Sequence, residues 1–131
     1  MKGWSLLIGA TTLLSAAMPL FAHHSFTAEF DVSQPITLTG VVTKVEWANP
    51  HTFFYVDVKD LVSGKTANWA CEMGSPNGLQ RQGWNRNTLK VGMLVSLDGS
   101  RARNGTNKMN ARNVTVDGKK LGAASSEGVT P

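Results

Sequence analysis

Apolar and polar residues alternate along residues 36–58, which read ITLTGVVTKVEWANPHTFFYVDV. Threonine, valine, isoleucine and aromatic residues dominate this stretch, and such side chains suit a half-buried pleated surface. The alternation predicts a long strand over residues 36–47, a tight corner at residues 48–50 and a second strand over residues 52–58. In the second strand, Phe54, Val56 and Val58 are expected to face the core.

The apolar phase of the first strand changes at Gly40. Ile36 and Leu38 share one face before this glycine, whereas Val41 and Val45 share a face after it. A slip of one residue at a glycine is typical of a β-bulge or a sharp coil. We therefore predict that the strand bends at Gly40, with Val41 turned inward, so that it can pair with both halves of a small barrel.

The rest of the chain supplies further elements. Alternation predicts strands over residues 66–73, 93–101 and 108–116. Ser75 predicts the start of a short helix over residues 77–82, which Gly83 ends. The order of three strands, one helix and two strands predicts an all-β fold, a small five-stranded OB-like barrel over residues 36–121. A small sandwich or an SH3-like barrel is the alternative, and the helix between strands three and four favours the OB-like barrel.

The two ends of the chain differ from this central part. Residues 1–22 hold one lysine, an apolar run and a final alanine, which predicts a signal peptide cut after Ala22; the alternative is a retained membrane anchor. Residues 23–35 are expected to form a polar N-terminal arm fastened by Phe26 and Phe30, and residues 122–131 a disordered tail. A cleaved signal implies a periplasmic or secreted bacterial protein with no remaining membrane span.

The net charge of +4 is distributed unevenly. Residues 23–72 hold all three histidines and more acidic than basic residues, whereas residues 81–120 hold nine basic residues and two acidic ones, Asp98 and Asp117. A basic half can meet an anionic polymer or lipid surface. Because this half contains no dense basic run, an ordinary solvated face is the alternative that we favour.

Cys71 is the only cysteine, which excludes an internal disulfide bond. A lone thiol in an oxidising compartment is either buried or a route to a covalent dimer. Cys71 alternates in phase with Trp69 and Met73, so we expect it to be buried and the protein to be a monomer.

The histidines predict a metal site. If the chain is cut after Ala22, His23 becomes the first residue, and its α-amine and Nδ1 can chelate one metal ion. An imidazole from His24 or His51 would complete three nitrogen ligands in a T, a geometry that suits copper(II). The arm of residues 23–35 is long enough to fold back to His51 beside the proline corner. Alternatively, His23 and His24 are an exposed dipeptide, and His51 makes hydrogen bonds within the turn.

Aromatic and basic side chains predict a second binding surface. OB-type barrels bind oligonucleotides or oligosaccharides across strands two and three, and stacking platforms combine aromatic residues with arginines. Here the platform would comprise Trp47, Phe53, Tyr55, Asn68, Arg101, Arg103 and Arg112. The exported location argues against nucleic acid, which leaves a glycan, an anionic envelope component or a protein as the partner. The alternative is that the aromatic residues only cover the adjoining arm.

The common enzymatic motifs are missing from the sequence: it contains no G-x-S-x-G, P-loop, C-x-x-C or H-E-x-x-H. Glu46, Asp57 and Glu72 could form a carboxylate pair, but alternation places them on exposed faces. We therefore expect a non-catalytic binding or accessory module that binds copper. A structural interaction domain for an anionic envelope component, a glycan or a protein is the alternative.

Several short segments carry a resemblance to a known family. They are HHSF at residues 23–26, NPH at residues 49–51, EMGSP at residues 72–76, and Leu79 with Gly83 and Trp84. Together they resemble an uncharacterised family of exported bacterial proteins, a domain of unknown function, over about residues 23–121. The resemblance implies a single secreted β-rich domain and brings no established activity, cofactor or catalytic residue.

Overall fold

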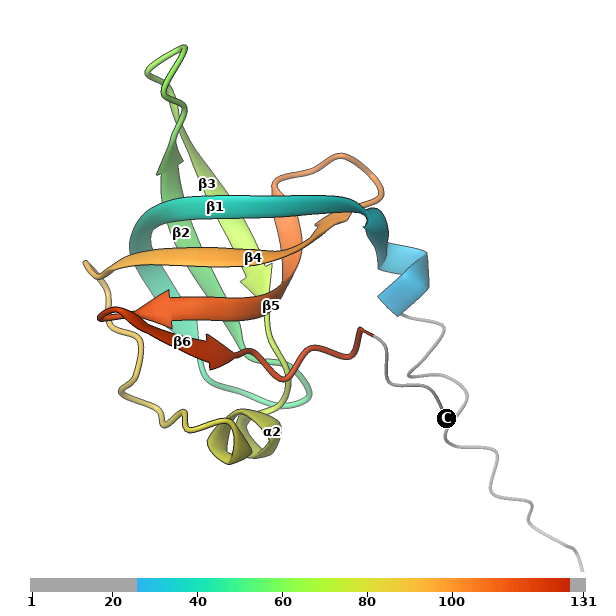
Figure 1. The fold of residues 1–131 in the computed structure, drawn as a ribbon, viewed down its shortest axis with the longest axis vertical. Coiled ribbons are helices and arrows are strands. Elements are labelled where there is room, and N and C mark those ends of the chain that lie inside the picture. The colour runs from blue at the N-terminus through green and yellow to red at the C-terminus, as the bar shows by residue number, and fades with distance from the viewer. Residues whose placement is uncertain (1–25, 128–131) are drawn as a thin grey trace, which may run out of the picture.

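The computed structural model describes residues 26–127, and Figure 1 shows how their strands curl around one core. Residues 26–29 are helical and lead into the first strand. The remaining elements are β1 (Phe30–Glu46), β2 (Phe53–Lys59), β3 (Thr66–Glu72), α2 (Pro76–Arg81), β4 (Leu94–Ala102), β5 (Lys108–Val116) and β6 (Lys119–Gly122).

The strands form one sheet that closes into a ring. Neighbouring strands follow the order β3-β2-β1-β4-β5-β6, and every pair in this order is antiparallel. A short parallel pairing between β3 and β5 joins the two ends of the five-stranded part. The predicted mainly β fold with a helix between strands three and four is confirmed. β6 is an additional strand, which the turn at Asp117 and Gly118, both with positive φ, folds back against β5.

β1 differs from its prediction in two ways. It begins at Phe30, so the second part of the predicted arm is already strand, and Phe26 and Phe30 pack with Ala102 as the sequence predicted. The change of phase does not lie at Gly40, because Val42 is 1% exposed and Val41 is 41% exposed. The irregularity lies between Val42 and Lys44 in the pairing with β2.

Gly40 has a different function in β1. A Cβ atom at this position would lie 2.5 Å from the carbonyl oxygen of Asp57 on β2. The two backbones therefore approach each other at Gly40 more closely than any side chain allows. The sequence correctly identifies Gly40 as a position that requires glycine. The reason is the close approach of β1 and β2, however, and not a β-bulge at this residue.

The core fills the ring. Phe54, Val56, Trp69, Cys71 and Met73 are buried, as their alternation predicts. The buried residues that complete the same cluster are Leu38, Val42, Leu79, Trp84, Leu89, Val95, Leu97, Met109, Ala111, Val114, Val116, Leu121 and Ala123.

The short helix α2 and the nearby Trp84 close one end of the ring. The side chain of Ser75 caps α2 by accepting a hydrogen bond from the backbone N–H of Gly78. Trp84 Nε1 donates to the carbonyl oxygen of Gly122 over 2.8 Å. Leu79 and Trp84 are both buried.

The tail prediction is wrong for Gly122–Glu127. Ala123 is fully buried, its N–H donates to the carbonyl oxygen of Arg112, and its carbonyl accepts from the N–H of Gly74. A Cβ atom at Gly74 would lie 2.3 Å from the carbonyl oxygen of Ala124. Small residues in this segment fit closely against the corner before α2, so the small and polar composition reflects tight packing.

The predicted signal peptide and the first residues of the predicted arm lie outside the described residues. Within residues 26–127, no helix is long and apolar enough to cross a lipid bilayer.

Replacing Gly40 with alanine is expected to lower the free energy of unfolding by about 2–3 kcal/mol, because the new Cβ would overlap the backbone of β2. Urea unfolding followed by tryptophan fluorescence measures the change. Gly122→Ala is the control, since its new Cβ would meet only the end of the flexible Gln82 side chain, at 2.9 Å from Oε1. Equal losses in the two variants would contradict the importance of the close approach.

Candidate functional site

Glu72 is a buried carboxylate at the end of β3. Alternation with Cys71 predicted an exposed side chain, and that prediction is wrong, because Glu72 is 5% exposed. The residue pairs with Phe53 on β2 and with Asn110 on β5, so strands flank it on both sides. The parallel β3–β5 contact could not be seen in a local pattern, and it is this contact that covers the outer face of Glu72.

Two side chains lie close to the Glu72 carboxylate, the imidazole of His51 and the ammonium group of Lys108. His51, in the corner before β2, places Nδ1 3.5 Å from Oε1 of Glu72. Lys108, at the start of β5, places Nζ 3.9 Å from Oε2. Lys108 also forms an ion pair and hydrogen bond with Glu29, which lies in the helical residues before β1. We call His51, Glu72, Lys108 and Glu29 the corner cluster.

Aromatic rings line the cationic side of the corner cluster. Lys108 Nζ lies 5.6 Å from the ring centroid of Phe30 and 5.4 Å from that of Phe53. Both distances are within the range of cation–π attraction. The ammonium group is therefore held between two rings and two carboxylates, which fixes its position.

Burial raises the pKa of the Glu72 carboxyl above its ordinary value. The nearby His51 opposes this by favouring the charged form, while Glu29 repels that form and raises the pKa further. Lys108 and a hydrogen bond from Asn110 lower it. The net upward direction shows that removal of the carboxylate from water outweighs its favourable neighbours.

The contact with Glu72 distinguishes the two nitrogens of His51. A carboxylate beside Nδ1 favours the tautomer that carries a proton there, which leaves the lone pair on Nε2. The side chain of His51 is 39% exposed, so the ring is open to an incoming ligand. A carboxylate–histidine pair of this kind is how proteins commonly orient a histidine that binds a metal ion.

The corner cluster does not hold a complete set of metal ligands by itself. Among residues 26–127, no three His, Cys, Asp or Glu side chains gather so as to hold a metal ion. Of the predicted ligands, His23 and His24 lie outside the described residues, and His51 lies at the predicted corner. The pair of Glu29 with Lys108 brings the start of the described chain to the corner cluster.

The predicted aromatic platform is divided by the structure. Phe53 and Tyr55 lie together on the outer face of β2, where Tyr55 OH donates to Glu46 over 3.3 Å and Lys44 lies 5.4 Å from the Tyr55 ring. Trp47 instead packs against the core and lines a small pocket with Met73. Asn68 donates to Asp57 and Thr43 on the same outer face.

The three arginines of that predicted surface contact other parts of the chain. Arg101 lies 5.2 Å from the Trp69 ring, and Arg103 donates to the carbonyl oxygen of Thr27 over 2.6 Å. Arg112 pairs with Glu127 at 2.6 and 2.8 Å. Their part in ligand binding stays a prediction, but the contacts show that each arginine fastens a strand, the N-terminal residues or the C-terminal segment.

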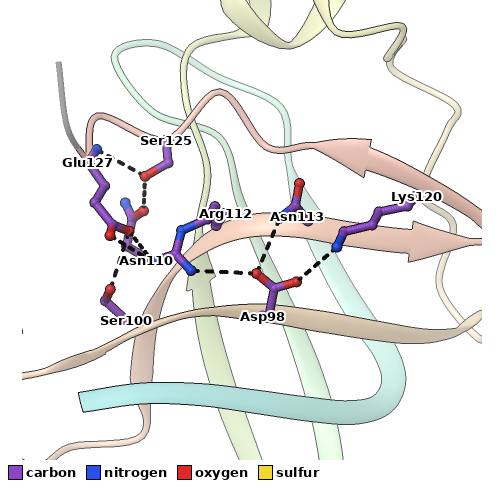
Figure 2. A network of polar contacts seen from close by, with 8 residues as sticks. All are labelled: Asp98, Ser100, Asn110, Arg112, Asn113, Lys120, Ser125 and Glu127. Carbon is purple, nitrogen blue, oxygen red and sulfur yellow. Dashed lines mark hydrogen bonds and ion pairs between the residues drawn. The ribbon is translucent and has the colours of Figure 1, made fainter. Parts of the chain in front are cut away.

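Arg112 belongs to a polar network that holds the C-terminal segment, shown in Figure 2. Glu127 accepts from Arg112 and Ser100, and Ser125 donates to the buried Asn110 over 2.6 Å. On the other side of Arg112, Asp98 lies 3.9 Å from both Arg112 and Lys120 and accepts from Asn113. Because Asn110 is paired with Glu72 between β5 and β3, the network reaches the corner cluster.

Cys71 is buried beside this site but faces the core. Burial raises the pKa of its thiol to about 12. The predicted burial is confirmed, and a thiol with this pKa is protonated at neutral pH and unreactive.

Comparisons with known proteins give a family but no activity. A family model described as "Family of unknown function (DUF6152)" matches residues 10–111. A comparison with curated proteins found no match.

The raised pKa of Glu72 predicts the sign of its contribution to stability. The folded state binds the Glu72 proton more tightly than the unfolded state, so this contribution is largest below the ordinary carboxyl pKa and declines as the pH rises through the folded pKa. Residue 72 cannot titrate in Glu72→Gln. The free energy of unfolding of the native protein, minus that of the variant, should therefore decrease as the pH rises through this range. Urea unfolding from pH 4 to 8, with a chelator present, measures this difference, and a difference that does not change with pH would contradict the raised pKa.

Proposed function

The chain belongs to the family of unknown function DUF6152, and from its corner cluster we propose that it is a non-catalytic binding module that holds one copper(II) ion. The observation that carries the proposal is the buried Glu72 carboxylate at Nδ1 of His51. This contact leaves Nε2 as the coordinating nitrogen. Glu72 acts as a positioning residue that orients the ring rather than as a ligand.

The remaining ligands would come from the start of the mature chain. His24 stands two residues before Phe26, which corresponds to about 7 Å of extended chain. Glu29 is already at the corner cluster through Lys108. The α-amine and Nδ1 of His23, with Nε2 of His51, would provide three nitrogen ligands, a set that suits copper(II). His24 is the alternative source of the third imidazole.

The charge of the corner cluster supports binding of a cation. Two carboxylates, Glu29 and Glu72, and one ammonium group, Lys108, lie beside the His51 ring. The carboxyl groups outnumber the ammonium group, which favours a cation at His51. A divalent cation at His51 would reduce the repulsion between the two carboxylates, which contributes to raising the pKa of Glu72.

We further propose that the protein functions outside the cytoplasm. A free amine on His23 requires cleavage after Ala22, as in an exported protein of the periplasm or the external medium. A binding rather than a catalytic function is supported by the sequence, which lacks the common enzymatic motifs. It is further supported by Cys71, whose buried thiol is not a nucleophile.

A second candidate function is recognition of an envelope glycan or protein by the outer face of β2. Phe53 and Tyr55 lie side by side there and are half-buried, and Ala70 on β3 pairs with Tyr55. A small residue opposite Tyr55 leaves room beside its ring for a ligand to stack. Metal content of the protein purified from the periplasm separates this function from copper binding.

Protein that begins at His23 is expected to bind one copper(II) ion with a Kd of about 1 µM or below, a dissociation constant that calorimetry measures directly. One extra residue before His23 converts the amine into an amide and should weaken binding sharply. His51→Ala should also weaken binding, because it removes the third nitrogen. Equal binding with and without the extra residue would exclude the amine as a ligand.

Glu72→Gln tests the positioning function of the carboxylate. We expect copper affinity to fall by about 10–100-fold, as is typical when the partner of a ligating histidine is lost. Glu46→Gln is the matched control, because Glu46 is a half-exposed carboxylate on β1, which is not paired with β3, and it forms an ion pair with Lys44. Electron paramagnetic resonance of the bound copper should show a changed nitrogen hyperfine pattern in Glu72→Gln alone. Unchanged affinity and spectrum in this variant would show that Glu72 does not orient His51.

A further inference from the structure

Exposed apolar side chains gather at the end of the molecule where the β2–β3 hairpin projects. The large exposed apolar residues of the described chain are Val32, Val41, Leu61, Val62, Val91 and Leu94. All except Val32 lie in this hairpin, in β1 next to the start of β4, or in the turn before β4. Leu61 and Val62 are the extreme cases, with 95% and 98% of their surface exposed.

The hairpin tip is a well-defined turn rather than a loose loop. Asp60 accepts hydrogen bonds from the backbone N–H groups of Val62 at 2.8 Å and Ser63 at 2.7 Å. The backbone of Asp60 is also bonded to Lys65 and Gly64, and Gly64 adopts the positive φ that the turn needs. These bonds hold the two apolar side chains away from the core, and Figure 1 shows the hairpin extending beyond the ring.

A groove continues the apolar surface from the tip toward the ring. Its volume is about 610 Å³, and its lining includes Leu61 together with Val41, Val58 and Leu94. β1 and the hairpin diverge here, because β1 pairs with β2 only from Val41 onward. The groove is open to solvent, and the tip beyond it projects as a convex apolar edge.

Two lysines flank the tip, and the aspartates near it, Asp57 in the groove and Asp60 in the turn, are engaged in hydrogen bonds within the chain. Lys59 and Lys65 flank Leu61 and Val62 in the hairpin, and both lysines are exposed. Asp60 is the one acidic residue between them, and its carboxylate bonds to the backbone of its own turn. Apolar side chains at a tip with lysines directly behind them match the depth profile of an anionic bilayer, where acyl chains lie below negative headgroups.

We propose that the β2–β3 hairpin attaches the protein to an anionic phospholipid surface, with Leu61 and Val62 inserted between the headgroups and Lys59 and Lys65 among the phosphates. A convex tip enters a soft surface without shape complementarity, whereas a protein partner would need a matching pocket. The hairpin and the corner cluster lie at opposite ends of β3, which is seven residues long. At about 3.3 Å per residue, an attached protein would keep His51 about 20 Å from the lipid surface.

The test uses a fluorescent label at the tip of the full chain. Val62→Cys provides a single accessible thiol, because the native Cys71 is buried. An environment-sensitive dye at position 62 should shift to shorter wavelength with vesicles of phosphatidylglycerol and not with vesicles of phosphatidylcholine. Val32→Cys, labelled in the same way, is the control at an exposed apolar position away from the hairpin, and its dye should not shift.

Substitutions then measure the contribution of each part to vesicle binding. Leu61→Ser with Val62→Ser should reduce the partition coefficient of the unlabelled protein for phosphatidylglycerol vesicles by about tenfold or more. Lys59→Gln with Lys65→Gln should reduce it by a comparable factor, and added salt should reduce native binding. Undiminished binding by either double variant, or no shift of the dye at position 62, would overturn the proposal. So would a native dimer in solution that the Leu61 and Val62 substitutions abolish, because the tip would then bind a second copy.

Discussion

A parallel pairing of three residues between β3 and β5 holds this structure together. Ala70, Cys71 and Glu72 lie opposite Lys108, Met109 and Asn110, and the pairing turns a curved sheet into a closed ring. The residues of both strands that face inward, Cys71 and Met109, are fully buried. Those that face outward include Glu72 and Lys108, so the contact that encloses the core also assembles the corner cluster.

The buried carboxylate at this closure draws both ends of the described chain toward it. Lys108 reaches from Glu72 to Glu29 and thereby fixes the residues before β1. Asn110 is paired with Glu72 across the two strands and accepts a hydrogen bond from Ser125, which belongs to the C-terminal segment. A buried charge needs such compensation, because desolvation without partners is costly. The polar contacts at the two ends are therefore part of what allows Glu72 to remain buried on the outer face of the sheet.

The sequence predicted local elements well and distant contacts poorly. The bounds of β5, the cap of α2 and the inward faces of β2 and β3 follow from alternation and turn chemistry within a few residues. Which side of β1 turns inward after Gly40 depends on the register with β2, and a valine on either side fits the pattern equally well. The same holds for the site. His51 was found from its place beside a proline, whereas Glu72 was placed outside because β5, which covers it, is more than thirty residues away in sequence.

The packing of the C-terminal segment has a practical consequence for producing other members of the family. Gly74 has no room for a side chain because the backbone of Ala124 lies against it, and the buried Ala123 bonds to Gly74 and Arg112. Residue 111, where the family match ends, falls inside β5. A fragment that ends at that boundary would lack the second half of β5 and all of β6. It would also lack Ala124, and the backbone of Gly74 would be exposed. Expression boundaries for relatives should therefore extend about fifteen residues beyond the end of the family match, to the position equivalent to Glu127.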